Sequence, residues 1–310
     1  MSLFVLIILA GLSDSPQGAP ALQADQSSSA SGTLLLGSVI YECNFGSSAD
    51  RDSDGWPDGW IRRRGPGFHD FIKIGIAEDT DANPPGGMLR IELNGGSAAI
   101  ASPRIPVTSS YSYVLEGDVR TAGLVNDDAL VAVSFLDAQG ATLENRLTTL
   151  PPASREWESF RLGPFTPVEK SAAASFTLQV SPRGKRQDLH GQATFRNLRL
   201  QRLPRMALRT PSAGNVFTAK DQVEILCEIA GIPQSQTALV FELFDQDDHC
   251  LDTNREVLAR GSDALARASW KPKIPDYGFY RVTVSWQGNE NSMLTRSERA
   301  PYGALTLAKI

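Results

Sequence analysis

The sequence predicts an all-β protein made of two β-sandwich domains, and three observations carry this prediction. Along most of the chain, short segments alternate apolar and polar residues, which is the pattern of a strand with one buried face. Turn-forming residues separate these segments, and no stretch shows the apolar spacing of a long amphipathic helix. The length of 310 residues suits two domains of ordinary size, each with a core of its own.

In the first domain, the alternating segments identify the residues expected to point into the core. They are Leu89, Ile91 and Leu93 in MLRIEL, Val131, Val133 and Phe135 in LVAVSFL, and Phe176, Leu178 and Val180 in SFTLQV. A turn is expected at 137–140, where DAQG separates two strands. In ATFRNLRLQRL the alternation slips by one residue between Phe195 and Leu198, so a β-bulge is expected at Arg196 and Asn197.

The second domain is expected to begin after Pro204, because proline cannot donate a hydrogen bond to a continuing sheet. A hairpin with its turn at 246–249 is expected in ALVFELFDQDDHCL. The residues expected to point inward are Val223, Ile225, Cys227 and Ile229 in VEILCEI and Tyr280, Val282, Val284 and Trp286 in YRVTVSW. Strands and turns at this spacing suit a sandwich of about a hundred residues.

The segment DYGFYRV resembles the tyrosine corner of immunoglobulin-like domains, because it places Asp276, Gly278 and Tyr280 at the spacing of that motif. Val282 stands where antibody-type domains carry their second cysteine, so Cys227 has no such partner. The resemblance implies an immunoglobulin-like sandwich at 205–310. A generic turn before a strand is the alternative interpretation.

The charge balance argues against a nucleic-acid partner, because 30 Lys and Arg stand against 35 Asp and Glu and no long basic run occurs. The apolar start MSLFVLIILAGL, followed by small and polar residues, is typical of a secretory signal peptide and is too short to span a bilayer. Residues 1–24 are therefore expected to be a signal peptide cut near Ala21 or Ala24, although no basic residue precedes the apolar run. A disordered linker at 25–37 and domains at 38–204 and 205–310 are expected to follow. The mature chain would be exported to the periplasm, the cell surface or the extracellular space, with no stable membrane span.

Neither a disulfide framework nor a zinc site is expected, because the three cysteines show no paired spacing. A bridge between Cys227 and Cys250 and a buried free thiol at Cys227 both remain open. His69, His190 and His249 lie in polar, turn-like segments without a nucleophile motif beside them. No catalytic residue is assigned, and the chain is expected not to be an enzyme.

The stretch ADRDSDGWPDGWIR at 49–62 concentrates acidic residues in one loop. Alternating carboxylates around a glycine can direct several oxygens at one hard cation. The pattern matches only the first half of an EF-hand loop, since Ile61 stands where that loop has its last glutamate. Two interpretations stay open, a solvated acidic turn and a calcium site whose ligands would be Asp50, Asp52, Asp54 and Asp58.

Aromatic residues supply the second functional signal in the first domain. Aromatic rings can stack on the apolar face of a sugar while polar neighbours bind its hydroxyl groups. Trp60 and Trp157 flank apolar strand residues and are expected to be structural. The aromatic residues assigned to a candidate carbohydrate site are Trp56, Phe68 and Tyr111. Of the candidate aromatic residues in the first domain, Trp56 is the one most expected to be exposed, because it lies inside the acidic loop.

From about Ser38 to Leu203 the chain resembles a jelly-roll carbohydrate-binding module of the galactose-binding-like kind. The segments that carry the resemblance are, in order, IYECNF, DGWPDGW, SPRIPVTSSYSYVLEGDVRT, FLDAQGATL, REWESFRLGPFTPVEKSAAASFTLQVSP and GQATFRNLRLQRL. The resemblance implies a jelly-roll sandwich that binds polysaccharide. Members of this family often hold a structural calcium ion between a Glu and an Asp at positions that read Gly46 and Arg196-Asn197 here, so that particular ion is not expected.

A jelly-roll module followed by an immunoglobulin-like domain is similar to the accessory region of large exported glycoside hydrolases. The resemblance implies a non-catalytic, exported polysaccharide-binding protein whose second domain acts as a spacer. Two alternatives stay open. One is a structural or adhesion protein without sugar binding, and the other is an N-terminal fragment of a glycoside hydrolase.

Overall fold

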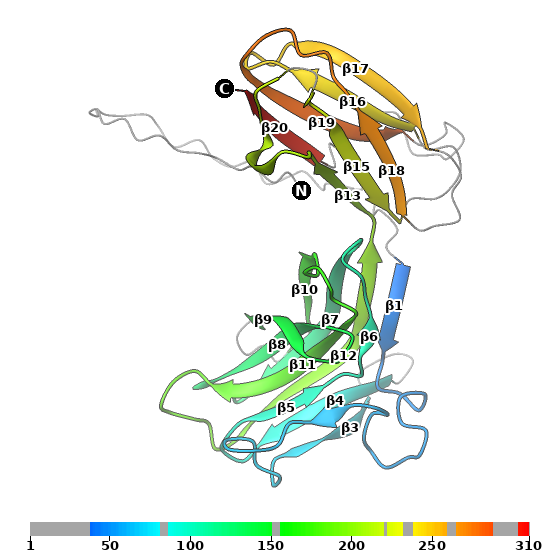
Figure 1. Cartoon of the computed structure of the whole chain (residues 1–310). Coiled ribbons are helices and arrows are strands. Elements are labelled where there is room, and N and C mark those ends of the chain that lie inside the picture. The colour runs from blue at the N-terminus through cyan, green and yellow to red at the C-terminus, as the bar shows by residue number, and fades with distance from the viewer. Residues whose placement is uncertain are drawn as a thin grey trace, which may run out of the picture. The chain divides into compact units, whose positions relative to one another are not determined.

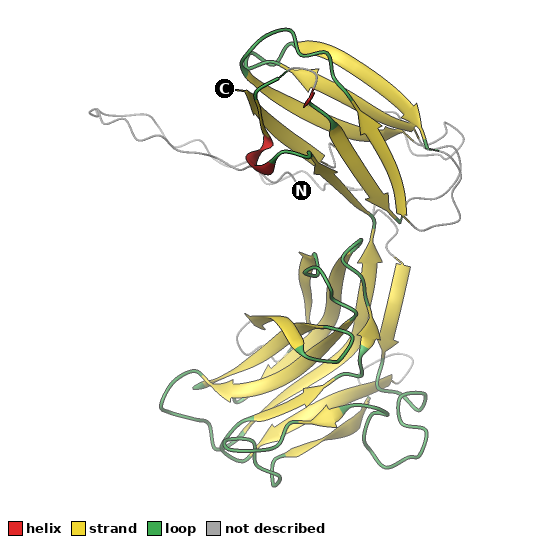
Figure 2. Ribbon diagram, viewed as in Figure 1, coloured by secondary structure: helices red, strands yellow, loops and turns green. Residues whose placement is uncertain are grey.

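The computed structural model describes residues 38–80, 86–150, 156–219, 222–231, 238–258, 265–287 and 303–309. Contacts divide the chain into two compact units, with the boundary between Arg205 and Met206 (Figure 1). Strands dominate both units, and the described residues contain helix only as short 3-10 turns such as η1 (Ala213–Asn215) (Figure 2). The predicted all-β class is confirmed. The described part of the chain contains no helix long and apolar enough to cross a bilayer, and the expected signal peptide and linker lie outside it.

The first unit is a β-sandwich of two antiparallel six-stranded sheets. Sheet A has the order β10-β7-β12-β4-β3, and β1 also pairs with β12. Its strands are β1 (Ser38–Cys43), β3 (Lys73–Asp79), β4 (Gly86–Leu93), β7 (Ser112–Ala122), β10 (Glu158–Phe165) and β12 (Gly191–Leu203). Most neighbours in the sheet are distant along the chain, as in a jelly roll.

Sheet B covers the inner face of sheet A and has the order β2-β5-β11-β8-β9, with β6 also paired to β11. Its strands are β2 (Ile61–Arg62), β5 (Ala98–Ala101), β6 (Ile105–Pro106), β8 (Asp127–Leu136), β9 (Thr142–Thr149) and β11 (Ala173–Pro182). The nine inward residues predicted in MLRIEL, LVAVSFL and SFTLQV are each at most 5% exposed. The predicted turn at 137–140 joins β8 to β9, and the Gly140 amide donates to the Asp137 carbonyl at 3.0 Å.

The predicted β-bulge in β12 is confirmed. The register between β12 and β7 shifts between Arg196 and Arg199, and Asn197 adopts a φ of 53°. Asparagine tolerates this left-handed conformation better than most residues with a side chain. The shift returns both Phe195 and Leu198 to the core, and it lies where β12 changes its neighbour from β4 to β1.

The loop between β1 and β2 is anchored to the core by Trp60, as predicted. The Trp60 side chain is 5% exposed, and its ring centroid lies 5.5 Å from that of Phe45 and 5.4 Å from that of Phe176. Its indole Nε1 donates to the Tyr41 hydroxyl at 3.1 Å. Burial of this ring gives the loop an apolar attachment that its aspartates could not provide.

The second unit is also a two-sheet β-sandwich, with the orders β13-β15-β18 and β14-β20-β19-β16-β17. The strands are β13 (Arg205–Arg209), β14 (Val216–Phe217), β15 (Ile225–Ala230), β16 (Ala238–Phe244), β17 (Cys250–Val257), β18 (Leu265–Trp270), β19 (Phe279–Gln287) and β20 (Gly303–Lys309). The predicted inward residues are buried, except that the side chain of Trp286 lies outside the described part. The β16–β17 hairpin forms as predicted, and the Tyr280 hydroxyl donates to the Asp276 carbonyl at 2.8 Å, which is the hydrogen bond of a tyrosine corner.

All three cysteines are free thiols, so the alternative of a Cys227–Cys250 bridge is wrong. Cys227 is buried in the core of the second unit and Cys43 in that of the first, whereas Cys250 is exposed. Burial raises the pKa of the Cys227 thiol to about 12, because the thiolate would lose its hydration. The alternative interpretation of Cys227, a buried free thiol, is therefore confirmed.

Candidate functional site

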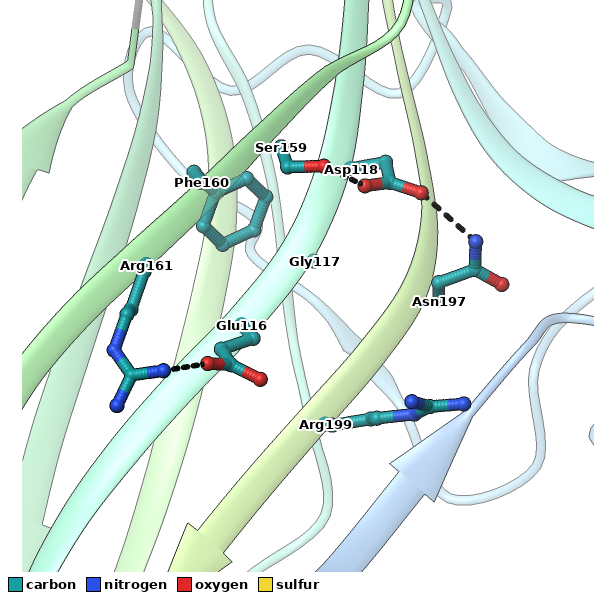
Figure 3. A pocket seen from close by; sticks show the side chains of 8 residues that line it. All are labelled: Glu116, Gly117, Asp118, Ser159, Phe160, Arg161, Asn197 and Arg199. Atoms are coloured by element: carbon teal, nitrogen blue, oxygen red, sulfur yellow. Dashed lines mark hydrogen bonds and ion pairs between the residues drawn. The ribbon is translucent and has the colours of Figure 1, made fainter. Parts of the chain in front are cut away.

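Polar side chains gather on the outer face of sheet A, where β10, β7 and β12 lie side by side. Each strand contributes two outward residues at alternate positions, on the face opposite the core. We call these six residues the sheet-A patch: Ser159 and Arg161 from β10, Glu116 and Asp118 from β7, and Asn197 and Arg199 from β12. They line a depression of about 390 Å³ (Figure 3).

The floor of the depression is shaped by Gly117. A Cβ atom at this position would lie 2.8 Å from the Phe160 ring and 2.5 Å from the Leu198 side chain. Both neighbours are buried on the core side of sheet A. The glycine therefore lets two large core residues pack directly beneath the point where the patch carboxylates emerge.

The two carboxylates of the patch are held by donors from the neighbouring strands. Arg161 donates to one Glu116 oxygen, and the Gln201 amide donates to the other at 2.6 Å. The Ser159 hydroxyl and the Asn197 amide donate to the two Asp118 oxygens, at 2.7 and 2.8 Å. These bonds orient the carboxylates before any ligand arrives.

The ionisation of Asp118 follows from these contacts. Burial by itself would raise its pKa, but the hydrogen bonds from Ser159, Asn197 and Arg196, together with the Arg196 charge, outweigh that effect. The pKa of Asp118 therefore lies below its usual range, and the group is ionised at neutral pH. The patch itself contains two carboxylates and two guanidinium groups, so it presents many donors and acceptors with no excess of charge.

One edge of the patch is formed by Arg196 and Trp157. Arg196 pairs with Asp79 at 2.5 Å and with Asp118 at 3.3 Å, and its guanidinium carbon lies 4.0 Å from the centroid of the Trp157 ring. The guanidinium carbon of Arg120 lies 4.6 Å from the same centroid. Trp157 is thus partly exposed, and its ring contacts two guanidinium groups of sheet A.

The aromatic residues assigned from the sequence do not form one site. The indole of Trp56 is partly buried and donates to the Trp60 carbonyl at 3.0 Å, and Phe68 lies under the Arg63 guanidinium at 4.4 Å. Tyr111 is 6% exposed, with the Arg202 guanidinium 4.4 Å from its ring centroid, so its assignment as a sugar platform is wrong. No ring contact or hydrogen bond joins these three residues within the described part of the chain.

The acidic loop brings three of its four aspartates together. Carboxylate oxygens of Asp50, Asp52 and Asp58 lie within 4.8 Å of one another, whereas Asp54 accepts the Trp56 amide at 2.8 Å. Arg51 pairs with Asp58 at 2.5 Å, and this hydrogen bond lowers the pKa of that carboxyl. The charge of Asp54 raises the pKa of Asp52. Arg196 in β12 is already paired with two carboxylates, those of Asp79 and Asp118.

Comparisons with known proteins yield similar folds only. No protein-family model matches the chain, and no curated protein matches it. Carbohydrate-binding modules of families 22, 11 and 16 are among the similar solved structures. The CBM22-1 xylan-binding domain of Paenibacillus barcinonensis Xyn10C is 12% identical, with a TM-score of 0.35, over 54% of this chain and 96% of that one.

Enzymes are also among the similar structures. A cyclase from Fischerella sp. TAU is 14% identical, with a TM-score of 0.38, over 54% of this chain and 98% of that one. The enzymatically active domain of bacteriophage CBA120 tailspike protein 4 is 14% identical, with a TM-score of 0.38, over 47% of this chain, which spans only 20% of that domain. Similarity at this level does not distinguish a binding module from an enzyme.

Proposed function

We propose that the first unit is a non-catalytic module that binds an uncharged polysaccharide through the sheet-A patch. The observation that carries the proposal is the set of pre-oriented, charge-balanced polar groups around a depression on one exposed sheet face. Sugar hydroxyl groups both donate and accept, so they suit a surface of carboxylates, guanidinium groups and amides.

Several features support binding rather than catalysis as the role of this patch. Both carboxylates already accept hydrogen bonds from fixed partners, and Asp118 has a lowered pKa, which does not suit a general acid. The two arginines that line the depression, Arg161 and Arg199, are about half exposed. Contacts of this kind give modest affinity, in the micromolar to millimolar range common where few contacts are buried.

The test is affinity electrophoresis of the full chain in gels that contain xylan, β-glucan, galactan, pectin or fucoidan. We expect retardation by a neutral polysaccharide, and loss of about tenfold or more in affinity for Asp118→Ala and Arg161→Ala. Asp248→Asn is the matched control, because it removes an exposed carboxylate that pairs with Arg281 at 2.6 Å in the second unit. Equal retardation of all variants would place the binding elsewhere, and no retardation in any gel would refute the proposal.

We propose that the chain is exported. We also propose that the second unit is an immunoglobulin-like domain and acts as a spacer, as in the accessory regions of glycoside hydrolases. The hydrogen bond from Tyr280 to the Asp276 carbonyl supports this domain type. The convergence of Asp50, Asp52 and Asp58 supports a calcium ion in the first loop. Repeating the gels with chelator tests whether calcium in the first loop is needed for polysaccharide binding. Loss of retardation with chelator would link the loop to binding.

A further inference from the structure

One end of the first unit exposes apolar side chains at the tips of its loops. Val125 in the β7–β8 loop is 73% exposed, Leu189 in the β11–β12 loop is 65% exposed, and Phe71 before β3 is 57% exposed. Single exposed apolar residues are common on protein surfaces. Three of them on neighbouring loops require a more specific explanation.

Hydrogen bonds and close contacts show that these loops lie together. The Val125 amide donates to the Asp188 carboxylate at 2.7 Å, which places Val125 beside the residue next to Leu189. The Gly96 amide donates to the Gln187 side chain at 3.0 Å, so the β4–β5 turn joins the same group.

The same β4–β5 turn brings Phe71 into the group. A Cβ atom on Gly96 would lie 2.7 Å from the His69 ring, and that ring stacks on Phe71 with centroids 4.9 Å apart. The three apolar tips therefore belong to one continuous end of the sandwich, which we call the loop end.

The loop end carries a basic excess although the whole chain has a net charge of −5. Residues 62–72, 94–97, 123–128 and 183–190 contain six Arg and Lys against four Asp. The aspartates are all engaged. Asp70 pairs with Arg62 and Arg64, and Asp128 pairs with Arg183. Asp188 accepts the backbone amides of residues 125–127, and Asp127 accepts the Asp188 amide, so these two aspartates link the two loops. Among the described residues, Arg63, Lys185 and Arg186 are exposed and have no carboxylate partner.

We propose that the loop end docks on the surface of an anionic lipid bilayer. Apolar tips surrounded by unpaired basic residues fit the two layers of that surface, since the tips can enter the acyl boundary while the cations meet anionic headgroups. A soluble polyanion would engage the cations but would leave Val125 and Leu189 in water. The inference is independent of the sheet-A patch, because none of its residues belongs to that patch.

The test is sedimentation of the full chain with vesicles of phosphatidylcholine alone and with about 30% phosphatidylglycerol. We expect binding to the anionic vesicles that weakens as salt is raised, because the headgroup attraction is screened. Lys185→Ser with Arg186→Ser should weaken it by about fivefold per charge removed. Val125→Ser with Leu189→Ser should weaken it at least about tenfold. All four residues are exposed, so neither pair of substitutions should disturb the fold.

Val257→Ser, which removes an exposed apolar residue from the second unit, is the control and should bind as the wild type does. Each other outcome overturns the proposal. The variants keep the apolar residues 1–12, so unchanged lipid binding in all of them would assign it to that segment. If only the variant with Lys185→Ser and Arg186→Ser lost binding, and if dextran sulfate displaced the wild type fully from the vesicles, the loop end would be assigned to a soluble polyanion. Absence of binding to anionic vesicles would refute it directly.

Discussion

Replacement of Asn197 tests whether the β-bulge depends on a residue that tolerates a positive φ. Asn197 has a φ of 53° and also donates to Asp118 at 2.8 Å. Asn197→Gly and Asn197→Ala both remove that hydrogen bond, so its loss cancels when the two variants are compared. Only the backbone preference differs between them.

The size of the difference follows from two opposing effects. A Cβ atom in the left-handed region costs alanine about 1–2 kcal/mol relative to glycine. Glycine loses about 0.4–1 kcal/mol more than alanine through the entropy of the unfolded chain. The first effect is the larger, so Asn197→Gly should be about 0.5–1 kcal/mol more stable than Asn197→Ala. In a unit of this size, that difference corresponds to about 1–4 °C in Tm.

Differential scanning calorimetry of the two variants measures this difference directly. Asn197→Val extends the series, because a β-branched residue is less tolerant of positive φ than alanine and should melt lowest. An alanine variant as stable as the glycine variant would refute the argument. The bulge would then be held by its neighbours, Phe195 and Leu198, and not by the conformational tolerance of residue 197.

Three further predictions concern other parts of the molecule. Gly87→Ala should destabilise the first unit by about 2 kcal/mol or more in urea unfolding, because the new Cβ would lie 1.7 Å from the Phe45 carbonyl oxygen. Gly86→Ala is the control and should be tolerated, because a Cβ at that position meets nothing within 4 Å. One thiol per native chain, that of Cys250, should react rapidly with Ellman's reagent, and three after denaturation; a second fast thiol in the native protein would contradict the burial described. Burial by itself would raise the pKa of Asp188, but hydrogen bonds from the Asn126 side chain and from three backbone amides outweigh it and lower that pKa. The stability that Asp188 contributes should therefore be full above pH about 4 and should fall as the pH drops through its folded pKa. The stability gap between wild type and Asp188→Ala, measured by urea unfolding at about pH 7 and about pH 3, should narrow at the lower pH.

Local features of the chain were predictable because their physical causes lie within a few residues. Alternation with a period of two selects the face of a strand that enters the core, and the slip between Phe195 and Leu198 can be reconciled with a buried face only by an extra residue. The anchoring role of Trp60 and the tyrosine-corner spacing around Tyr280 are equally local. Each of these follows from side-chain chemistry and position along one strand or turn.

The candidate site was not predictable in this way, because strand order decides it. Glu116 and Asp118, Ser159 and Arg161, and Asn197 and Arg199 are three ordinary pairs of outward polar residues, separated by about 40 residues along the chain. They become one patch because β7 lies between β10 and β12 in sheet A. The same cause explains the misassigned aromatic residue, since the burial of Tyr111 and its contact with Arg202 depend on a partner 91 residues away. Alternation along a strand determines which side chains face outward, whereas the long-range pairing of strands determines which of them meet.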